Sequence, residues 1–241
     1  MDWSEAARRL SLGEVGVLPT DTMYGVVASA LKPAAVERVY DLRRRELGKP
    51  MIVLIGGWED LERFGMTVEP PTRGWLEKVW PGPVSVVLPA QGWGLEYLHR
   101  GTGGIAFRMP AKPQLRALLA AIGPIVAPSA NLAGEAPARD VAEAKHYFGE
   151  DAFYLDEGEL RNPPSALVDA RVFPPKVLRP AHGFKIEKAF NLGAPNAAFA
   201  HRSSYRQPPD AAPIPFSRTA DARGWAPTRG RRDYYVCSTG V

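Results

Sequence analysis

The chain has 241 residues, of which 45% are hydrophobic and 23% charged, and this composition is typical of a globular protein with one main domain. Residues 1–180 hold 21 Lys and Arg against 22 Asp and Glu, a net charge of −1, whereas residues 181–241 hold 9 against 4, a net charge of +5. Because the main part is almost neutral, its net charge gives no support for broad electrostatic binding of RNA. The single cysteine, Cys237, excludes an intramolecular disulfide and a cysteine metal cage.

The sequence lacks the motifs of several common classes of protein. The first five residues lack the basic and apolar regions of a signal peptide, and no apolar run approaches the ~20 residues of a membrane span. We therefore expect a cytoplasmic protein without a membrane segment. The four histidines are widely spaced and form no metal-ligand signature, and no Walker A, G-x-G-x-x-G or G-x-S-x-G pattern occurs.

Apolar periodicity and turn residues predict helices that alternate with short strands. Helices are expected at residues 4–12, 33–44, 58–64, 71–80, 112–122 and 138–148, and strands at residues 15–18, 26–28, 51–55, 84–88, 104–108, 125–127, 152–155, 165–169 and 176–180. We expect Ser4 to cap the first helix and residues 91–103 to form an irregular loop. Such alternation predicts an α/β sheet with helices on its faces, in which ligands bind beyond strand ends.

A polar turn lies between the first two predicted strands, where residues 19–25 read Pro-Thr-Asp-Thr-Met-Tyr-Gly. Pro19 fixes its own φ and Gly25 allows a close backbone approach, so the turn can present its hydroxyls, carboxylate and phenol at a strand end. The alternative is a turn whose threonines and aspartate bond only their own backbone.

A cluster of four cations follows at the predicted end of helix 33–44. It consists of Arg43, Arg44 and Arg45 in a row and Lys49 four residues later. Such a cluster could bind a polyphosphate, or it could merely offset the helix macrodipole and face water. On a continuous helix Arg43 and Arg45 would diverge by about 200°. They can therefore converge on one anion only if the helix ends there.

Two further strand ends carry polar residues. Arg108 ends the apolar strand 104–108, where it either pairs with a carboxylate or faces a ligand, and the strand context alone favours the pair. Ser129 and Asn131 follow strand 125–127 in a turn that reads Pro-Ser-Ala-Asn. Because serine and asparagine also favour helix caps and turns, a purely structural role is the alternative.

The composition changes beyond residue 180. Residues 181–241 contain six prolines, few aliphatic residues and a basic Arg-Gly-Arg-Arg stretch at 229–232. Low hydrophobicity with excess charge predicts disorder. An RNA-binding arm and a shifted reading frame remain alternatives for this tail.

Taken together, these stretches resemble the YrdC-like family of L-threonylcarbamoyladenylate synthases. Each motif alone is weak, but six in the family's order between about Gly13 and Pro180 are strong. The motifs are Pro-Thr-Asp-Thr-Met-Tyr-Gly at 19–25, Arg43-x-Arg45 with Lys49-Pro50, Trp80-Pro81-Gly82-Pro83-Val84-Ser85, the strand from Gly104 to Pro110 with its Arg-x-Pro end, Pro128-Ser129-Ala130-Asn131, and Ser165-Ala166-Leu167-Val168-Asp169. The resemblance implies a twisted, open mixed sheet flanked by helices, with a catalytic domain at 1–184. It adds no information on the tail at 185–241, which the composition alone sets apart.

The resemblance also implies a reaction. L-threonine, bicarbonate and ATP would give L-threonylcarbamoyl-AMP and pyrophosphate, and partner proteins would use the product to modify an adenosine of tRNA. The implied phosphate and nucleotide ligands are Arg43, Arg45, Lys49, Ser129 and Asn131, of which the first two are the catalytic candidates. The implied lining of the threonine and bicarbonate pocket is Thr22, Tyr24, Arg108 and Ser165. No residue is expected to bind a metal directly, and Mg²⁺ would bridge the phosphates.

This sequence departs from the family pattern at two positions. Arg43 stands where the family has lysine, which replaces a compact ammonium by a planar fork. Ala166 stands where the family usually has threonine, and we expect this to remove a hydroxyl from the pocket. These departures and the basic tail support the alternative of a non-catalytic RNA-binding module with the same fold, for which direct tRNA contact stays open. A carbamoyl-transfer maturation factor is a third hypothesis.

Overall fold

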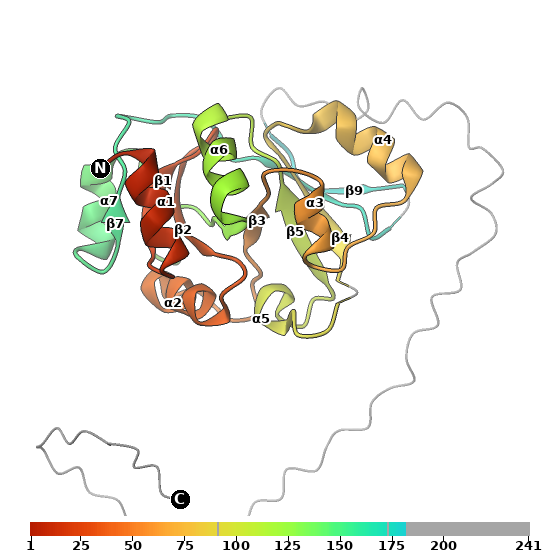
Figure 1. Cartoon of the computed structure of the whole chain (residues 1–241), viewed down its shortest axis with the longest axis horizontal. Helices are drawn as coiled ribbons and strands as arrows, with labels where there is room; N and C mark the ends of the chain where they lie inside the picture. Colours follow the sequence, from red (N-terminus) through yellow and green to blue (C-terminus); the bar gives the residue numbers. More distant parts are fainter. Residues whose placement is uncertain (91, 173, 182–241) are drawn as a thin grey trace, which may run out of the picture. The chain divides into compact units, whose positions relative to one another are not determined.

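The computed structural model describes residues 1–90, 92–172 and 174–181, and the predicted tail at 185–241 lies outside these ranges. The strands of the described part form one mixed sheet in the order β7-β1-β2-β6-β3-β5-β4-β8-β9 (Figure 1). They are β1 (Gly16–Pro19), β2 (Tyr24–Ser29), β3 (Ile52–Leu54), β4 (Val84–Pro89), β5 (Gly104–Arg108), β6 (Ile125–Val126), β7 (Phe153–Tyr154), β8 (Ala166–Asp169) and β9 (Lys176–Arg179). The pairs β1·β7, β3·β5 and β4·β8 are parallel and the other neighbours are antiparallel, which confirms the predicted mixed α/β sheet.

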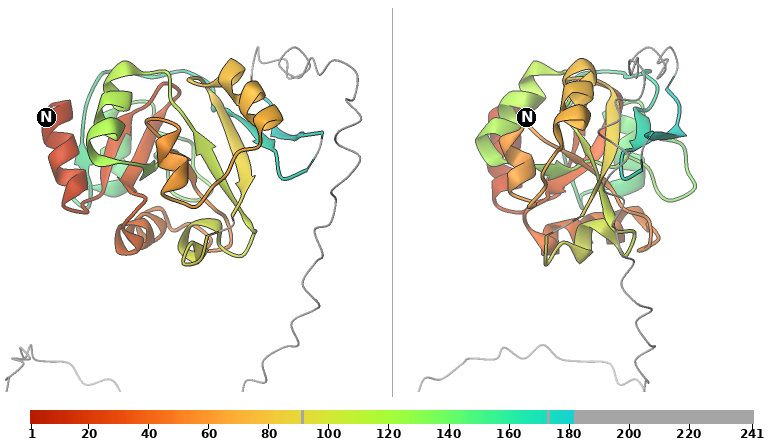
Figure 2. Two further views of the ribbon diagram at one scale, coloured as in Figure 1. Left: turned by 45° about the vertical axis from the view of Figure 1, so that its right-hand side comes forward. Right: turned by 90° about the vertical axis from the view of Figure 1, so that its right-hand side faces the viewer.

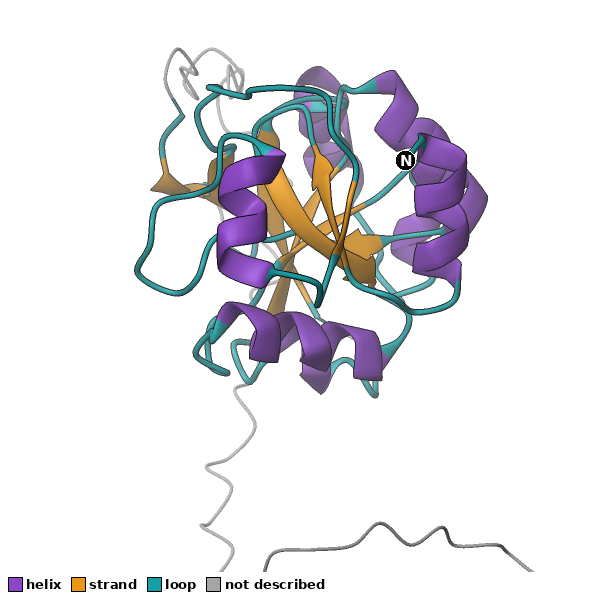
Figure 3. Ribbon diagram, turned by 90° about the vertical axis from the view of Figure 1, so that its left-hand side faces the viewer, coloured by secondary structure: helices purple, strands orange, loops and turns teal. Residues whose placement is uncertain are grey.

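Helices flank this sheet on both sides (Figure 3). They are α1 (Trp3–Ser11), α2 (Pro33–Arg43), α3 (Glu59–Glu62), α4 (Pro70–Val79), α5 (Glu96–His99), α6 (Pro113–Ile122) and α7 (Val141–Phe148). Helices α1 and α6 lie side by side in Figures 1 and 2, and their apolar residues form one buried cluster with inward residues of the strands. The other helices contribute to a second, larger cluster. None of the helices in the described ranges is long and apolar enough to cross a membrane.

Local chemistry explains where the first helices begin and end. The cap of α1 is Asp2, whose side chain accepts from the Glu5 backbone N at 2.8 Å, so the expectation that Ser4 caps this helix is wrong. Asp and Ser are comparably good caps, and the sequence alone does not separate two such residues two positions apart. Helix α2 starts at Pro33, as predicted, because proline at the first position loses no helical hydrogen bond. It stops at Arg43, since Arg44 is left-handed with φ 50°.

The predicted loop at 91–103 contains the short helix α5, which the sequence did not reveal. Leu95 and Leu98 are buried in the larger cluster and hold this single turn in place. One turn is too short to show a 3.6-residue apolar period, so tertiary packing decides this structure.

Strand alternation separates the core from a second surface of the same sheet, which lines a cavity. On β5, Ile105 and Phe107 belong to the larger apolar cluster, whereas Ala106 and Arg108 line a cavity. The same alternation holds on β8 and β4, because neighbouring residues of a strand point to opposite faces. One face of β5, β4 and β8 is therefore free to build a binding site.

Candidate active site

A cavity of about 640 Å³ lies where the polar turns meet that face of the sheet. The β1–β2 turn, the end of α2, the turn after β6 and the strands β5, β8 and β9 all contribute to it. Its charged lining residues in the described part of the chain are all arginines, with no carboxylate, lysine or histidine among them: Arg43, Arg45, Arg108, Arg171 and Arg179. Such a lining favours an anionic ligand.

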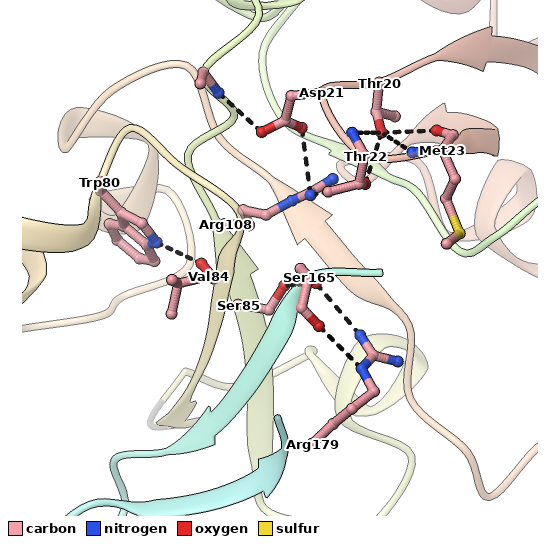
Figure 4. Close-up of polar contacts among 11 residues, drawn as sticks. Thr20, Asp21, Thr22, Met23, Trp80, Val84, Ser85, Arg108, Ser165 and Arg179 are labelled. Atoms are coloured by element: carbon pink, nitrogen blue, oxygen red, sulfur yellow. Dashed lines mark hydrogen bonds and ion pairs between the residues drawn. The ribbon is translucent and has the colours of Figure 1, made fainter. Parts of the chain in front are cut away.

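The β1–β2 turn is held by its first threonine. Thr20 Oγ1 donates to Met23 O at 2.7 Å and accepts from the backbone N of Thr22 and Met23 at 3.1 and 3.2 Å. The alternative reading of this turn is therefore correct for Thr20. Thr22 behaves differently, because its hydroxyl contacts Thr20 Oγ1 at 3.0 Å and also accepts from Arg108 (Figure 4).

Arg108 is 3% exposed and both pairs with a carboxylate and lines the cavity. Its Nη1 donates to Thr22 Oγ1 at 3.0 Å and lies 3.3 Å from Asp21 Oδ1, and Asp21 Oδ2 accepts from Ala111 N at 3.0 Å. Burial lowers the pKa of Arg108, although Asp21 opposes that shift. The Nε of Arg108 has no hydrogen-bond partner among the described residues. The pairing with a carboxylate that the strand context favours is therefore present, and the same side chain also borders the cavity.

Tyr24 borders the cavity, but its hydroxyl is already used. The fully buried ring carries an O–H that donates to Gly158 O at 2.8 Å and accepts from Glu157 N at 3.1 Å. Burial raises the pKa of this phenol, so it stays neutral. The contacts make Tyr24 an anchor for the loop at 156–158.

Arg43 and Arg45 both reach the cavity because α2 ends between them. Arg45 Nε donates to Lys49 O at 3.0 Å and its Nη2 donates to Pro50 O at 2.9 Å. The Tyr40 hydroxyl of α2 donates to the same Lys49 carbonyl at 3.1 Å, so this carbonyl is held by two side chains. Burial lowers the pKa of Arg45.

The side chain of Lys49 does not join this site. Its Nζ pairs with Glu46 Oε1 at 2.8 Å in an exposed ion pair, and Lys49 is not among the residues that line the cavity. What Lys49 offers is its backbone carbonyl, which accepts from Arg45 and Tyr40. The sequence motif indicated that Lys49 lies in the loop beside the cavity, but it could not show the direction of the side chain.

The turn after β6 faces Arg43. Arg43 is 3% exposed, its Nε donates to Asn131 O at 3.0 Å, and its Nη2 donates to Asn131 Oδ1 at 2.9 Å. Ser129 lines the cavity and donates to Asn131 Oδ1 at 2.6 Å, whereas Asn131 does not line it. Burial lowers the pKa of Arg43 to about 10, and the nearby charge of Arg45 adds to this shift.

On the opposite side of the cavity, Ser165 stands just before β8. Its Oγ lies 2.9 Å from Ser85 Oγ of β4 and 3.3 Å from Arg179 Nη2, and its carbonyl accepts from Arg179 Nε at 3.0 Å (Figure 4). The sequence analysis did not single out Arg179. Its signal was an arginine at a strand end followed directly by Pro180, similar to the Arg-x-Pro end at Arg108. Only the β8–β9 pairing shows that this end reaches the cavity.

Ala166 packs in the apolar core and is not among the residues that line the cavity. Its neighbours Ser165 and Leu167 line the cavity from the opposite face of the strand. The expectation that alanine here removes a hydroxyl from the pocket is therefore wrong, because strand alternation turns this position into the core.

These contacts define what the cavity can bind. The pKa values of Arg43, Arg45, Arg108 and Arg179 are all lowered by burial. An anionic ligand would offset this buried positive charge. Arg43 Nη1 and Arg108 Nε, which have no hydrogen-bond partner within the described part of the chain, are donors available for it. The arrangement suits binding and charge stabilisation rather than nucleophilic attack by the protein.

Known proteins resemble the chain over this whole region. The Sua5/YciO/YrdC family model, described as "Telomere recombination", matches residues 8–181. A relative from Mycobacterium tuberculosis (strain ATCC 25618 / H37Rv) is 33% identical over 180 residues, which cover 73% of this chain and 82% of that protein. Threonylcarbamoyl-AMP synthase from Nitrosococcus oceani is 32% identical over 169 residues, which cover 69% of this chain and 91% of that protein.

Solved structures agree. The crystal structure of P. abyssi Sua5 complexed with L-threonine superposes with a TM-score of 0.73 at 30% identity, and the match covers 78% of this chain but only 57% of that longer one. Its sheet and flanking helices therefore match those described above. On these grounds the chain belongs to the Sua5/YciO/YrdC family.

Proposed function

We propose that the chain is a threonylcarbamoyl-AMP synthase that makes L-threonylcarbamoyl-AMP from L-threonine, bicarbonate and ATP, with release of pyrophosphate. The observation that carries the proposal is the cavity, which residues of the described ranges line with five arginines and several hydroxyls but no carboxylate. The chain spans 91% of its relative from Nitrosococcus oceani, which bears the name of this activity. The described residues that line the cavity all lie within residues 8–181, which the family model matches.

The reaction asks the protein for positioning rather than for a nucleophile. The threonine amine takes up bicarbonate to give a carbamate and water. A carbamate oxygen then forms a bond to the α-phosphorus of ATP, and the bond to the β-phosphate oxygen breaks, so that pyrophosphate leaves with the electron pair. Both reactants are anionic, and buried cations can hold them together and stabilise the charge that builds up on the phosphates.

We assign two halves of the cavity to the two reactants. Arg43, Arg45 and Ser129 hold the nucleotide phosphates at the end of α2. Thr22 and Arg108 face threonine and bicarbonate in the other part of the cavity, which Tyr24 and Ser165 also line. Arg108 suits a carboxylate because it lies next to a hydroxyl and retains an unused N–H.

Magnesium enters this scheme only with the nucleotide. The described residues contain no group of three or more His, Cys, Asp or Glu that could hold a metal ion, and the cavity lining offers no carboxylate. Because Mg²⁺ prefers carboxylate oxygens when a protein binds it directly, these residues do not fit a protein-built magnesium site. Mg²⁺ would be bound by the triphosphate, and no step is assigned to it.

The product defines the partners. A mixed anhydride of a carbamate and AMP is a reactive acyl donor, and we propose that it passes to cytoplasmic proteins that modify tRNA. The buried position of the arginines argues for a small anion rather than a nucleic-acid backbone as the cavity's ligand.

The test is pyrophosphate release from ATP, with threonine, bicarbonate and magnesium each omitted in turn. We expect release that depends strictly on threonine and falls when bicarbonate is removed. Serine and valine in place of threonine check that the amino acid is recognised through its hydroxyl and its methyl group. Binding of tRNA at physiological salt, with no ATP turnover under any combination, would instead support the RNA-binding module.

A further inference from the structure

The guanidinium of Arg43 is almost completely committed to one neighbouring turn. Its Nε and Nη2 donate to the carbonyl and the side-chain oxygen of Asn131, and Nη2 also lies 3.4 Å from Ser129 Oγ. The backbone adds a further link, because Ala133 N donates to Arg43 O at 2.9 Å. Arg43 thus ties the end of α2 to the turn after β6, in an environment where it is 3% exposed.

Asn131 is just as fully engaged. Its Oδ1 accepts from Arg43 Nη2 and Ser129 Oγ, and its Nδ2 donates to Leu132 O at 2.7 Å and Glu135 O at 2.9 Å. An asparagine side chain has two N–H donors and one acceptor oxygen, so this side chain has no free donor. Asn131 also does not line the cavity.

One nitrogen of the Arg43 guanidinium does not take part in these contacts. Arg43 Nη1 is buried and has no hydrogen-bond partner among the described residues, although Arg43 lines the cavity. Burying an N–H group without a partner is unfavourable, and more so when the group is charged. This cost is removed when an anion in the cavity accepts from Nη1.

We infer that Asn131 is a positioning residue that acts on the nucleotide through Arg43: it engages two donors of the guanidinium, Nε and Nη2, so that Nη1 remains for a phosphate. This inference rests on the proposed function, because it names the phosphate groups of ATP as the anion. It depends on the arginine at position 43, since an ammonium could not donate to both Asn131 oxygens in this fork geometry and still present a fixed third donor.

A double-mutant cycle separates this role from direct contact. Dissociation constants for ATP and, separately, for inorganic pyrophosphate are measured by titration calorimetry on wild type, Arg43→Met, Asn131→Ala and the double variant. We expect Arg43→Met to weaken binding roughly tenfold or more and Asn131→Ala to weaken it severalfold. In the Arg43→Met background the Asn131 change should have almost no further effect, because its target is gone.

The outcomes are distinct. Losses that multiply in the double variant would mean that Asn131 contacts the ligand itself, which overturns this inference and leaves the proposed function intact. A wild type that binds neither ATP nor pyrophosphate overturns both. If Asn131→Ala does not fold, Asn131→Ser gives the same cycle, because its shorter side chain cannot reach Arg43 Nη2. Adenosine is the control ligand. Because it lacks phosphates, its affinity should not respond to either substitution.

Discussion

Arg44 and Arg45 are neighbours in the chain, but they differ in solvent exposure and in the groups that they contact. Arg44 is exposed and adopts the left-handed conformation that ends α2, whereas Arg45 is half-buried, bonded to two carbonyls and turned to the cavity. The two neighbouring cations of this cluster therefore point to different surroundings. One residue faces water at a helix end, and the next faces the site.

This contrast gives a matched pair of substitutions. Arg45→Gln and Arg44→Gln each remove one positive charge from the same loop. We expect Arg45→Gln to weaken ATP binding roughly tenfold or more, because a charge-assisted hydrogen bond is worth ~1.5–3 kcal/mol, and Arg44→Gln to change it little. Calorimetric titration with ATP measures both, and circular dichroism checks the fold. Equal losses in the two variants would mean that only the overall charge of the loop matters.

Ala166 gives a second prediction at this scale. Ala166→Thr restores the residue that the family usually has, but the side chain lies in the apolar core at 0% exposure. We expect a loss of stability of about 1–3 kcal/mol from overpacking and a buried hydroxyl, without a gain in turnover. Urea unfolding measures the loss, and Ala142→Thr on the exposed side of α7 controls for the substitution itself. A higher turnover at unchanged stability would put the hydroxyl in the pocket after all.

At the scale of elements, local patterns predicted most helices and strands but not their neighbours in space. The β1–β2 hairpin and the start of α2 at Pro33 follow from residues close together in the chain. The insertion of β6 between β2 and β3 does not, because it depends on pairings between segments far apart in sequence. The same limit explains the site, where Arg108 was recognisable at a strand end while Arg179 required the β8–β9 pairing. Side-chain directions, as at Lys49 and Ala166, also need the folded neighbours.

The end of β8 carries a prediction about pH. Asp169 is bonded to Arg171 through Nε and Nη2, and Arg171 Nη1 donates to Thr102 O at 2.6 Å, which links β8 to the segment before β5. The hydrogen bond from Arg171 is the main cause of the lowered pKa of Asp169. Since the folded pKa lies below the ordinary value of 3.8, this pair stabilises the fold fully above about pH 4 and loses its contribution as pH falls through the folded pKa.

Asp169→Asn tests that link. The partly exposed pair should contribute about 1 kcal/mol or less, so the variant should be slightly less stable than wild type at neutral pH. That difference should shrink as the pH falls below 3.8, the ordinary value for this carboxyl. Urea unfolding at several pH values gives the comparison, with exposed Asp151→Asn as the control. A stability difference that stays constant down to strongly acid pH would contradict the assignment to this carboxylate.

At the scale of the whole molecule, the family's motifs and the cavity end with β9, and residues 182–241 lie outside the described part. Their composition has too few aliphatic residues to offset an ordering cost of ~1–2 kcal/mol per residue. We therefore expect a chain truncated after Lys185 to keep its thermal midpoint and its pyrophosphate release. It should lose at most a salt-sensitive affinity for tRNA. Insoluble expression, or lost turnover at unchanged stability, would show that the tail supports the domain or the site.

The most direct measurement is the identity of the product. Wild-type protein is incubated with ATP, magnesium, L-threonine and ¹³C-labelled bicarbonate. The nucleotides are then separated rapidly, and their masses are measured by mass spectrometry. We predict a species with the mass of threonylcarbamoyl-AMP that carries the label from bicarbonate and disappears when threonine is omitted. Hydrolysis of ATP to AMP or ADP that proceeds equally without threonine, with no labelled nucleotide, would contradict the account.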